Sequence, residues 1–233
     1  MINPASEEIF RLYLTDVSSL SEKELFSGVY NRVNKGRKEI TDKYIFEKDK
    51  YLSLGVEYLL ITAASDFGLN YQSEEIIRKK GEKPFFKSAS AEFNLSHSGT
   101  KAICVFSGHV CGCDVEKINA AEDPFIRRFF HEKEAEYLLS FPEGEKRNTE
   151  FTRLWTLKES YVKCLGVGFG LSPTKYCIIP ENGKIVLTHT DEDSMFSFYE
   201  YDKKDGYKYA VCIKKSPLNS DIAGTVCEKE IIL

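Results

Sequence analysis

No stretch of this sequence approaches the run of about eighteen apolar residues that a membrane-spanning helix requires. The N-terminal segment carries the acids Glu7 and Glu8 and lacks the apolar core of a secretion signal. We therefore expect a cytoplasmic protein that does not enter a membrane.

The sequence also lacks an excess of positive charge. It contains 32 lysine and arginine residues against 36 aspartate and glutamate residues, which gives a net charge of −4. Proteins that bind nucleic acid generally present a net basic domain, so this balance argues against a nucleic-acid partner. Any group that holds a phosphate must therefore be a local feature.

Several common catalytic and cofactor motifs are missing as well. No glycine-rich loop of the type that cradles nucleotide phosphates is present, and no serine, histidine and aspartate order identifies a hydrolase triad. The 7 cysteines are an odd number without the spacing of a disulfide framework, which fits reduced thiols. A zinc site is one interpretation of His109, Cys111 and Cys113, which alternate along a strand. No second ligand pair follows them, and buried thiols are the alternative.

The chain has 233 residues, of which 42% are hydrophobic, and can form one large domain or two small ones. Strand-like and helical patterns follow the order strand, helices, strands roughly twice, without a linker between them. We therefore predict an α+β fold of two similar halves, residues 1–108 and 109–233. The patterns predict helices over 46–64, 124–130, 132–139 and 151–165, and strands over 8–14, 101–107, 110–116, 176–179, 184–188, 196–201 and 207–213.

Two local signals add detail to this outline. Ser21 and Glu24 have the spacing of a capping box at the start of a short helix. Gly108 and His109 separate the strands predicted over 101–107 and 110–116, which indicates a hairpin.

Two acids at the end of the second of these strands suggest a metal site. Asp114 and Glu116 stand two residues apart, and a strand directs such residues to the same face. Their carboxylates can share a hard cation such as Mg²⁺, which binds through one or two protein carboxylates together with substrate phosphate. The alternative is a solvated strand end with two unrelated acids.

The helix predicted over 151–165 supplies a third acid. Thr152, Thr156, Glu159 and Lys163 follow one stripe of this helix, and Glu159 and Lys163 are one turn apart. These two residues could complete a magnesium and phosphate site, or they could form an ordinary surface ion pair worth a few tenths of a kcal/mol.

Further polar groups lie upstream. Ser96 and His97 precede a glycine turn whose backbone donors, together with the hydroxyl and the imidazole, could cradle a phosphate. A hydrogen-bonded loop histidine is the alternative for His97. Lys35, Arg37 and Lys38 form a basic cluster that, taken alone, reads as a solvated face.

In their sequence order these motifs are similar to those of the Sfp-type 4′-phosphopantetheinyl transferases. Each motif is common by itself, whereas the ordered set extends over most of the chain and includes a late strand, 207–212. The motifs are Lys83-Pro84, Phe93-Asn94-Leu95-Ser96-His97-Ser98, Gly112-x-Asp114-x-Glu116, Phe151-x-x-x-Trp155-x-x-Lys158-Glu159-Ser160-x-x-Lys163 and Gly170-Leu171-Ser172.

The resemblance implies an enzyme that transfers the 4′-phosphopantetheine group of coenzyme A to a serine of an apo acyl or peptidyl carrier protein. It implies dependence on Mg²⁺ and release of adenosine 3′,5′-bisphosphate. It also implies a pseudo-dimer of the two α+β halves with the active site between them, acting as a monomer in the cytoplasm.

The resemblance further assigns roles to individual residues. Asp114, Glu116 and Glu159 would hold the metal, and Glu159 would be the base that deprotonates the carrier serine. Lys163 would be the second catalytic residue and would stabilise the departing phosphate. The coenzyme A contacts would come from Lys83 at the nucleotide end and from Ser96, His97, Lys158 and Lys163 at the phosphates.

One departure from the family pattern concerns the 3′-phosphate of coenzyme A. Tyr51-Leu52 stands where an Arg-Thr pair is expected, so Lys35, Arg37 and Lys38 are the candidate replacement cations. The apolar residues that follow the metal motif, Phe125, Phe129 and Phe130, are candidates for docking the carrier, with core packing as their alternative. Two other hypotheses are a magnesium-dependent phosphotransferase that acts on free nucleotides and a module that binds coenzyme A without chemistry.

Overall fold

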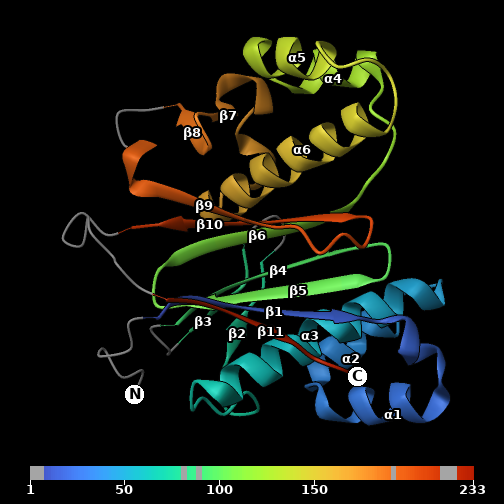
Figure 1. Ribbon diagram of the computed structural model, residues 1–233. Coiled ribbons are helices and arrows are strands. Elements are labelled where there is room, and N and C mark those ends of the chain that lie inside the picture. Colours follow the sequence, from blue (N-terminus) through green and yellow to red (C-terminus); the bar gives the residue numbers. More distant parts are fainter. Residues whose placement is uncertain (1–7, 80–82, 88–90, 190–192, 216–224) are drawn as a thin grey trace. The chain divides into compact units, whose positions relative to one another are not determined.

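The computed structural model describes residues 8–79, 83–87, 91–189, 193–215 and 225–233. Its contacts divide the chain into two compact units (Figure 1). Unit 1 contains residues 1–79, 84–109 and 222–233, and unit 2 contains residues 80–83 and 110–221. Each unit combines helices with a β-sheet, so the α+β fold class is confirmed.

Unit 1 contains a four-stranded sheet with the strand order β11-β1-β5-β4. Strand β1 is parallel to β11 and antiparallel to β5, and β4 is antiparallel to β5. The strands are β1 (Glu8–Asp16), β4 (Glu92–Ser98), β5 (Lys101–Ser107) and β11 (Thr225–Glu230), with a short pair β2 (Ile76–Ile77) and β3 (Phe85–Phe86) beside them. The helices are η1 (Ser18–Ser21), α1 (Lys23–Arg32), α2 (Lys35–Thr41) and α3 (Glu47–Asp66).

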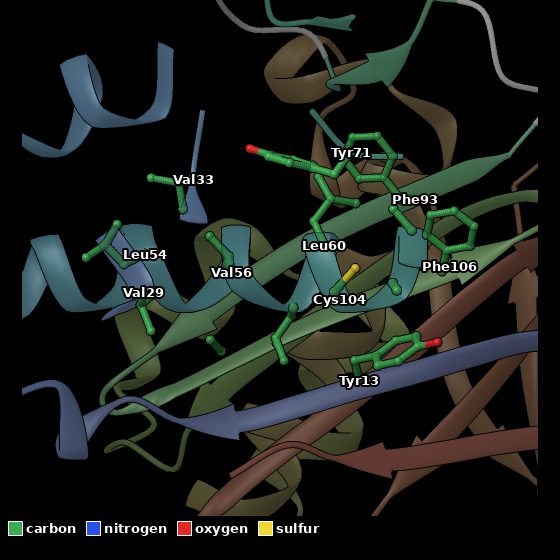
Figure 2. Close-up of a cluster of buried hydrophobic side chains, with 14 of the residues drawn as sticks. Tyr13, Val29, Val33, Leu54, Val56, Leu60, Tyr71, Phe93, Cys104 and Phe106 are labelled. Atoms are coloured by element: carbon green, nitrogen blue, oxygen red, sulfur yellow. The ribbon is translucent and has the colours of Figure 1, made fainter. Parts of the chain in front are cut away.

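Helix α3 covers one face of this sheet because its apolar residues recur at helical spacing. Figure 2 shows Leu60 of α3 in one buried cluster with Phe93, Phe106 and Tyr13 of β1. These four side chains are at most 1% exposed. Burying each stabilises the fold by about 2 kcal/mol, which makes this helix–sheet contact the core of unit 1.

Unit 2 contains a three-stranded antiparallel sheet with the order β6-β10-β9, and α6 packs on it. Figure 1 shows α4 and α5 on the side of α6 that faces away from this sheet. The strands are β6 (Val110–Lys117), β9 (Phe196–Tyr201) and β10 (Tyr207–Lys214), with a hairpin of β7 (Cys177–Glu181) and β8 (Lys184–Thr188). The helices are α4 (Asp123–Phe129), α5 (Glu132–Leu139), α6 (Glu145–Leu165), η2 (Gly168–Gly170), η3 (Pro173–Lys175) and η4 (Asp193–Met195).

Gly112 of β6 allows the strand and α6 to approach one another closely. A Cβ atom at this position would lie 2.2 Å from the Ser160 carbonyl oxygen and 2.3 Å from the Cys164 amide nitrogen. Both are backbone atoms and cannot rotate away. Helix α6 ends at Gly166, whose φ of 70° is the left-handed conformation that favours glycine at a helix C-terminus.

Three sequence-based expectations about local structure need correction. The strands over 101–107 and 110–116 exist, but they do not form a hairpin, because β5 pairs with β1 and β4 while β6 pairs with β10. No capping box forms at Ser21 and Glu24, because α1 begins at Lys23 with Glu22 as its N-cap and no side chain accepts the N-cap bond. Strand β11 lies beyond residue 108 in the chain, yet it pairs with β1 and belongs to the sheet of unit 1.

All seven cysteines lie in the described part of the chain, where none forms a disulfide, and six of them are buried. Among the helices in the described part of the chain, none has both the length and the apolar character needed to span a membrane.

Candidate functional site

Strand β6 directs its acids toward α6. Gly112, which contacts the α6 backbone, shares its face with Asp114 and Glu116 because alternate strand residues point the same way. Asp114 is 2% exposed, and its Oδ1 atom accepts a 2.6 Å hydrogen bond from Lys163 Nζ. The Asp114-x-Glu116 motif and the helix are therefore joined by a partly buried hydrogen bond.

Glu159 lies one helical turn before Lys163 and interacts electrostatically with the same carboxylate, that of Asp114. Burial and the negative charge of Asp114 raise the pKa of Glu159 above its ordinary value, and the Lys163 ammonium opposes them only in part. Burial lowers the pKa of Lys163, but Asp114 outweighs it and the net pKa is raised. Two carboxylates and one ammonium thus share a poorly solvated space, and a surface ion pair does not describe this arrangement.

The carboxylate oxygens of Asp114 and Glu159 are ligands of the kind that a hard divalent cation prefers. Asp114 and Glu159 repel one another electrostatically, and a cation between them would remove that repulsion. Among the described residues, however, no three His, Cys, Asp or Glu side chains are grouped closely enough to hold a metal. Asp114 and Glu159 therefore form the core of the candidate site, and Glu116 is a half-buried neighbour two residues further along β6.

Lys83 also lies beside β6. Its Nζ donates a 2.8 Å hydrogen bond to the carbonyl oxygen of Cys111, one residue before Gly112. Unit 2 therefore brings Lys83, Asp114, Glu159 and Lys163 to β6 and the α6 residues packed on it.

Lys158 occupies a different environment from the other predicted phosphate ligands. It is 1% exposed, and its Nζ donates to both carboxylate oxygens of Glu134, at 2.8 and 2.7 Å, and to the Tyr176 carbonyl oxygen at 3.0 Å. An ammonium has three hydrogens to donate, so these partners occupy all of them. We therefore leave Lys158 out of the candidate phosphate site.

Ser96 and His97 belong to unit 1, where consecutive residues of β4 point to opposite faces. Ser96 is 7% exposed, whereas His97 is an exposed residue. The two side chains therefore do not share one surface of β4, and of the two only His97 is accessible to a large ligand. Their predicted contacts with phosphate stay predictions.

The predicted basic cluster on α2 is divided in the structure. Arg37 is buried, with its guanidinium 2.5 Å from a carboxylate oxygen of Glu57 and 3.2 Å from Ser53 Oγ. Lys35 is exposed, and the Lys38 ammonium lies 5.2 Å from the centre of the Tyr30 ring. Only the two lysines remain as candidate cations, because Arg37 is held inside unit 1.

Other residues that the sequence singled out are part of the packing. Tyr51 packs edge-on against Phe26 with ring centres 6.0 Å apart, and Leu52 is 8% exposed. Phe130 is buried at 2%, which makes it a core residue, whereas Phe125 and Phe129 are only partly buried. The last two thus remain as docking candidates.

The sequence-based reasoning missed Glu134 and Glu57, the acids that hold the two buried cations. Glu134 could have been found, because its position three residues after His131 is that of a capping box, and this box forms at the start of α5. Glu57 carries no local signal, since it is one acid within the apolar face of α3.

Comparisons with known proteins converge on one group. The family model described as the 4′-phosphopantetheinyl transferase superfamily matches residues 110–212. The 4′-phosphopantetheinyl transferase gsp of Aneurinibacillus migulanus is 31% identical over 82% of this chain and 80% of its own length. The 4′-phosphopantetheinyl transferase Sfp of Bacillus subtilis is 26% identical over 92% of this chain and 96% of its own length. A solved holo-(acyl-carrier-protein) synthase of Bacillus anthracis is 22% identical with a TM-score of 0.40, over 46% of this chain and 96% of the other.

Proposed function

The chain belongs to the 4′-phosphopantetheinyl transferase superfamily, and we propose that it moves the 4′-phosphopantetheine group of coenzyme A to a serine of an apo acyl or peptidyl carrier protein. The proposal includes dependence on Mg²⁺ and release of adenosine 3′,5′-bisphosphate.

One observation carries the proposal beyond family membership. The partly buried contact between Asp114 of β6 and Lys163 of α6, with Glu159 one turn away, lies inside the matched region and combines acid, base and cation. Transfer between a diphosphate and a hydroxyl needs these three functions: a group that takes the serine proton, a group that holds a cation, and a positive charge near the leaving phosphate.

The chemistry assigns each residue one task. The serine oxygen attacks the phosphorus that bears pantetheine, and the bond from this phosphorus to the bridging oxygen of the diphosphate breaks. Glu159, directly or through a water that it orients, takes the serine proton, and burial suits this role because it raises the pKa of the carboxyl group. Lys163 then donates a hydrogen bond to the phosphate of the leaving adenosine 3′,5′-bisphosphate.

Asp114, Glu159 and, from the next accessible position on β6, Glu116 would hold magnesium. When bound, the ion neutralises charge on the diphosphate oxygens. Lys163 pairs with Asp114 in the absence of ligands, so substrate phosphate would compete for the same ammonium. This exchange couples binding of the diphosphate to release of the Asp114 carboxylate for the metal.

The remaining contacts with coenzyme A are assigned to other polar side chains. Lys83 beside β6 would bind the nucleotide end, His97 the phosphates, and Lys35 and Lys38 the 3′-phosphate. Ser96 would contribute its hydroxyl. We further propose that the enzyme acts as a monomer in a reducing cytoplasm, an environment that suits seven cysteines without a disulfide.

Mass spectrometry of an apo carrier protein tests this function directly. Incubation with the enzyme, coenzyme A and Mg²⁺ should add one phosphopantetheine to the carrier, and a serine-to-alanine carrier or excess chelator should prevent the addition. Turnover of free nucleotide without any carrier would support the phosphotransferase hypothesis instead. Binding of coenzyme A with no change in the mass of several different carriers would support a binding module.

A further inference from the structure

Helix α6 is held in its rotational orientation by two contacts that lie on either side of the candidate site. A residue on an α-helix is turned by about 100° from the one before it. Taking Lys158 as the origin, Glu159 and Lys163 lie at about 100° and 140°, and Ser160 and Cys164 lie at about 200° and 240°. The site residues therefore lie between Lys158 and the Ser160–Cys164 edge of the helix.

The Ser160–Cys164 edge is fixed by the backbone of β6. At Gly112 the strand comes so close that a methyl group would collide with main-chain atoms of the helix. This contact limits the distance between α6 and β6. It does not by itself prevent the helix from rolling on the strand, because a glycine offers no side chain that interlocks with its neighbour.

The Lys158 edge is fixed by an ion pair whose polar atoms are satisfied. Glu134 Oε1 also accepts a 2.6 Å hydrogen bond from the Ile178 amide of β7, and Oε2 accepts a 2.8 Å bond from the His131 amide at the start of α5. Each oxygen thus receives one backbone donor and the ammonium. Both residues are at most 1% exposed, so the pair connects α5, β7 and α6 inside unit 2.

Such a pair fixes the orientation of its side chains more than it stabilises the fold. Replacing a buried ion pair with neutral groups of similar size is often neutral for folding, because the charges lose their hydration when buried. Hydrogen bonds to a single carboxylate, in contrast, fix where the Lys158 side chain must point. Lys158 immediately precedes Glu159, so the orientation of one constrains the other.

We propose that Glu134 and Lys158 are positioning residues for the transfer reaction: their buried pair sets the roll of α6 and thereby directs Glu159 and Lys163 toward Asp114. The proposal rests on the proposed function of Glu159 and Lys163. Neither Glu134 nor Lys158 touches a substrate in this account.

The test compares E134Q, K158M and the E134Q/K158M double variant with R147M. Arg147 is a matched control because it is a buried cation on the same helix, paired with Asp123 at 2.7 Å, and it lies about 18 Å along the axis from Glu159. Each variant is assayed for carrier loading at a temperature at which circular dichroism shows it folded. The shift in Tm that Mg²⁺ and coenzyme A produce together is measured separately, so that one readout does not require turnover.

We expect E134Q and K158M to lower kcat by ten- to a hundredfold, since a small misplacement of a reacting group has effects of this order. KM for coenzyme A should rise as well, because Glu159 and Lys163 also hold the metal and the phosphate. The ligand-induced shift in Tm should shrink in both variants. The double variant should regain much of the wild-type Tm without regaining kcat. R147M should lose Tm but keep both kcat and the ligand-induced shift.

Two results would overturn the proposal. One is that E134Q and K158M behave like R147M, with a lower Tm and normal kcat. The other is that the double variant recovers kcat together with Tm, which would make the pair a stabilising contact only. A wild-type protein that loads no carrier would instead refute the proposed function, and the ligand-induced shift in Tm would then decide the positioning role. Should K158M fail to fold, E134Q and the double variant carry the comparison.

Discussion

Helices α3 and α6 contain 20 and 21 residues and each covers a sheet, but they bury different chemistry. Of the ten buried residues of α3, only Ser53 and Glu57 are polar. Of the nine buried residues of α6, five are polar: Arg147, Thr152, Thr156, Lys158 and Ser160. Apolar contacts are non-directional, so α3 is suited to closing a core. The directional contacts of α6 are suited to holding reactive groups in one arrangement.

Each unit contains a glycine with no room for a Cβ atom beside a helix, and the atoms around the two glycines differ. A Cβ at Gly55 of α3 would meet the Val17 Cγ1 atom at 2.3 Å, whereas a Cβ at Gly112 of β6 would meet the α6 backbone. A side chain can change rotamer to make room, and a hydrogen-bonded helix backbone must move as a whole. The contact in unit 2 is therefore the less tolerant of the two.

The largest predicted effect follows from this difference. Gly112→Ala should lower the free energy of unfolding by more than about 4 kcal/mol, because the helix must separate from the strand. Gly55→Ala should cost about 1–2 kcal/mol, because Val17 can adjust and alanine favours the helix by about 1 kcal/mol. Urea unfolding of both variants measures the difference. Equal losses would show that α3 and α6 approach their sheets under the same constraint.

The buried charge in unit 1 provides the next comparison. Glu57 of α3 pairs with Arg37 and Arg78 and accepts a hydrogen bond from the Tyr71 hydroxyl. Glu57→Gln leaves two guanidinium groups facing a neutral amide and should lower the free energy of unfolding by about 3 kcal/mol. The control is Glu47→Gln at the start of the same helix, where an exposed pair with Lys50 is worth about 0.5 kcal/mol.

Variants of Glu57 and Glu134 should differ in their effect on kcat, although both acids are buried in ion pairs. Below its unfolding transition, Glu57→Gln should keep kcat within about threefold of wild type, since Glu57 fixes a core and no reacting group. A large loss of kcat in the folded Glu57→Gln protein would contradict the assignment of the buried Glu57 cluster to folding alone.

Glu159→Gln should show the opposite behaviour. Carrier loading should fall by on the order of a hundredfold or more, because the change removes the base and a metal charge while keeping the side-chain volume. Burial and Asp114 raise the pKa of Glu159, so ionisation of this acid costs stability as pH rises through the unfolded value of 4.5. At pH 7 without metal, the variant should therefore unfold at the same temperature as wild type or higher.

Lys163→Met should likewise lower kcat. If both variants load carrier within a few-fold of the wild-type rate, the mechanism is refuted.

The sequence predicted the elements whose apolar residues are periodic and missed those defined by distant partners. The α3 pattern placed its helix within a few residues of Glu47–Asp66. Helix α6 begins at Glu145, six residues before the predicted start, because its first turns are polar and Arg147 anchors them to Asp123. The hairpin error has the same origin, since the partner of β6 is β10, about a hundred residues further along the chain.

The same limit applies to the candidate site. Strand and helix periodicity correctly placed Asp114, Glu159 and Lys163 on faces that can meet, and the contact between Asp114 and Lys163 is present. The family resemblance assigned Lys158 to the phosphate site, and no local feature of the sequence reveals that Glu134 lies against it in the fold. Burial of a charged residue depends on its tertiary partner, which the spacing of residues along one helix does not contain.

The smallest predicted effect contrasts a carboxylate of unit 1 with Glu159. Burial raises the pKa of Asp16 in β1, but hydrogen bonds from Ser18, Thr100 and Lys101 outweigh it and lower the pKa from 3.8 to about 2. Asp16 therefore stabilises the fold above pH 3.8, and this stability is lost as the pH falls toward 2. The side chain is 40% exposed, so solvent screening reduces the contribution to about 1 kcal/mol. Denaturant unfolding between pH 5 and pH 2 should show this loss in wild type and a smaller one in Asp16→Asn, whereas Glu159→Gln should leave the Asp16 contribution intact. If Asp16→Asn and wild type lose the same stability over this range, the hydrogen bonds at the end of β1 do not favour the ionised carboxylate. The pKa shifts of Asp16 and Glu159 would then no longer be opposite in direction, and this contrast between the two units would be lost.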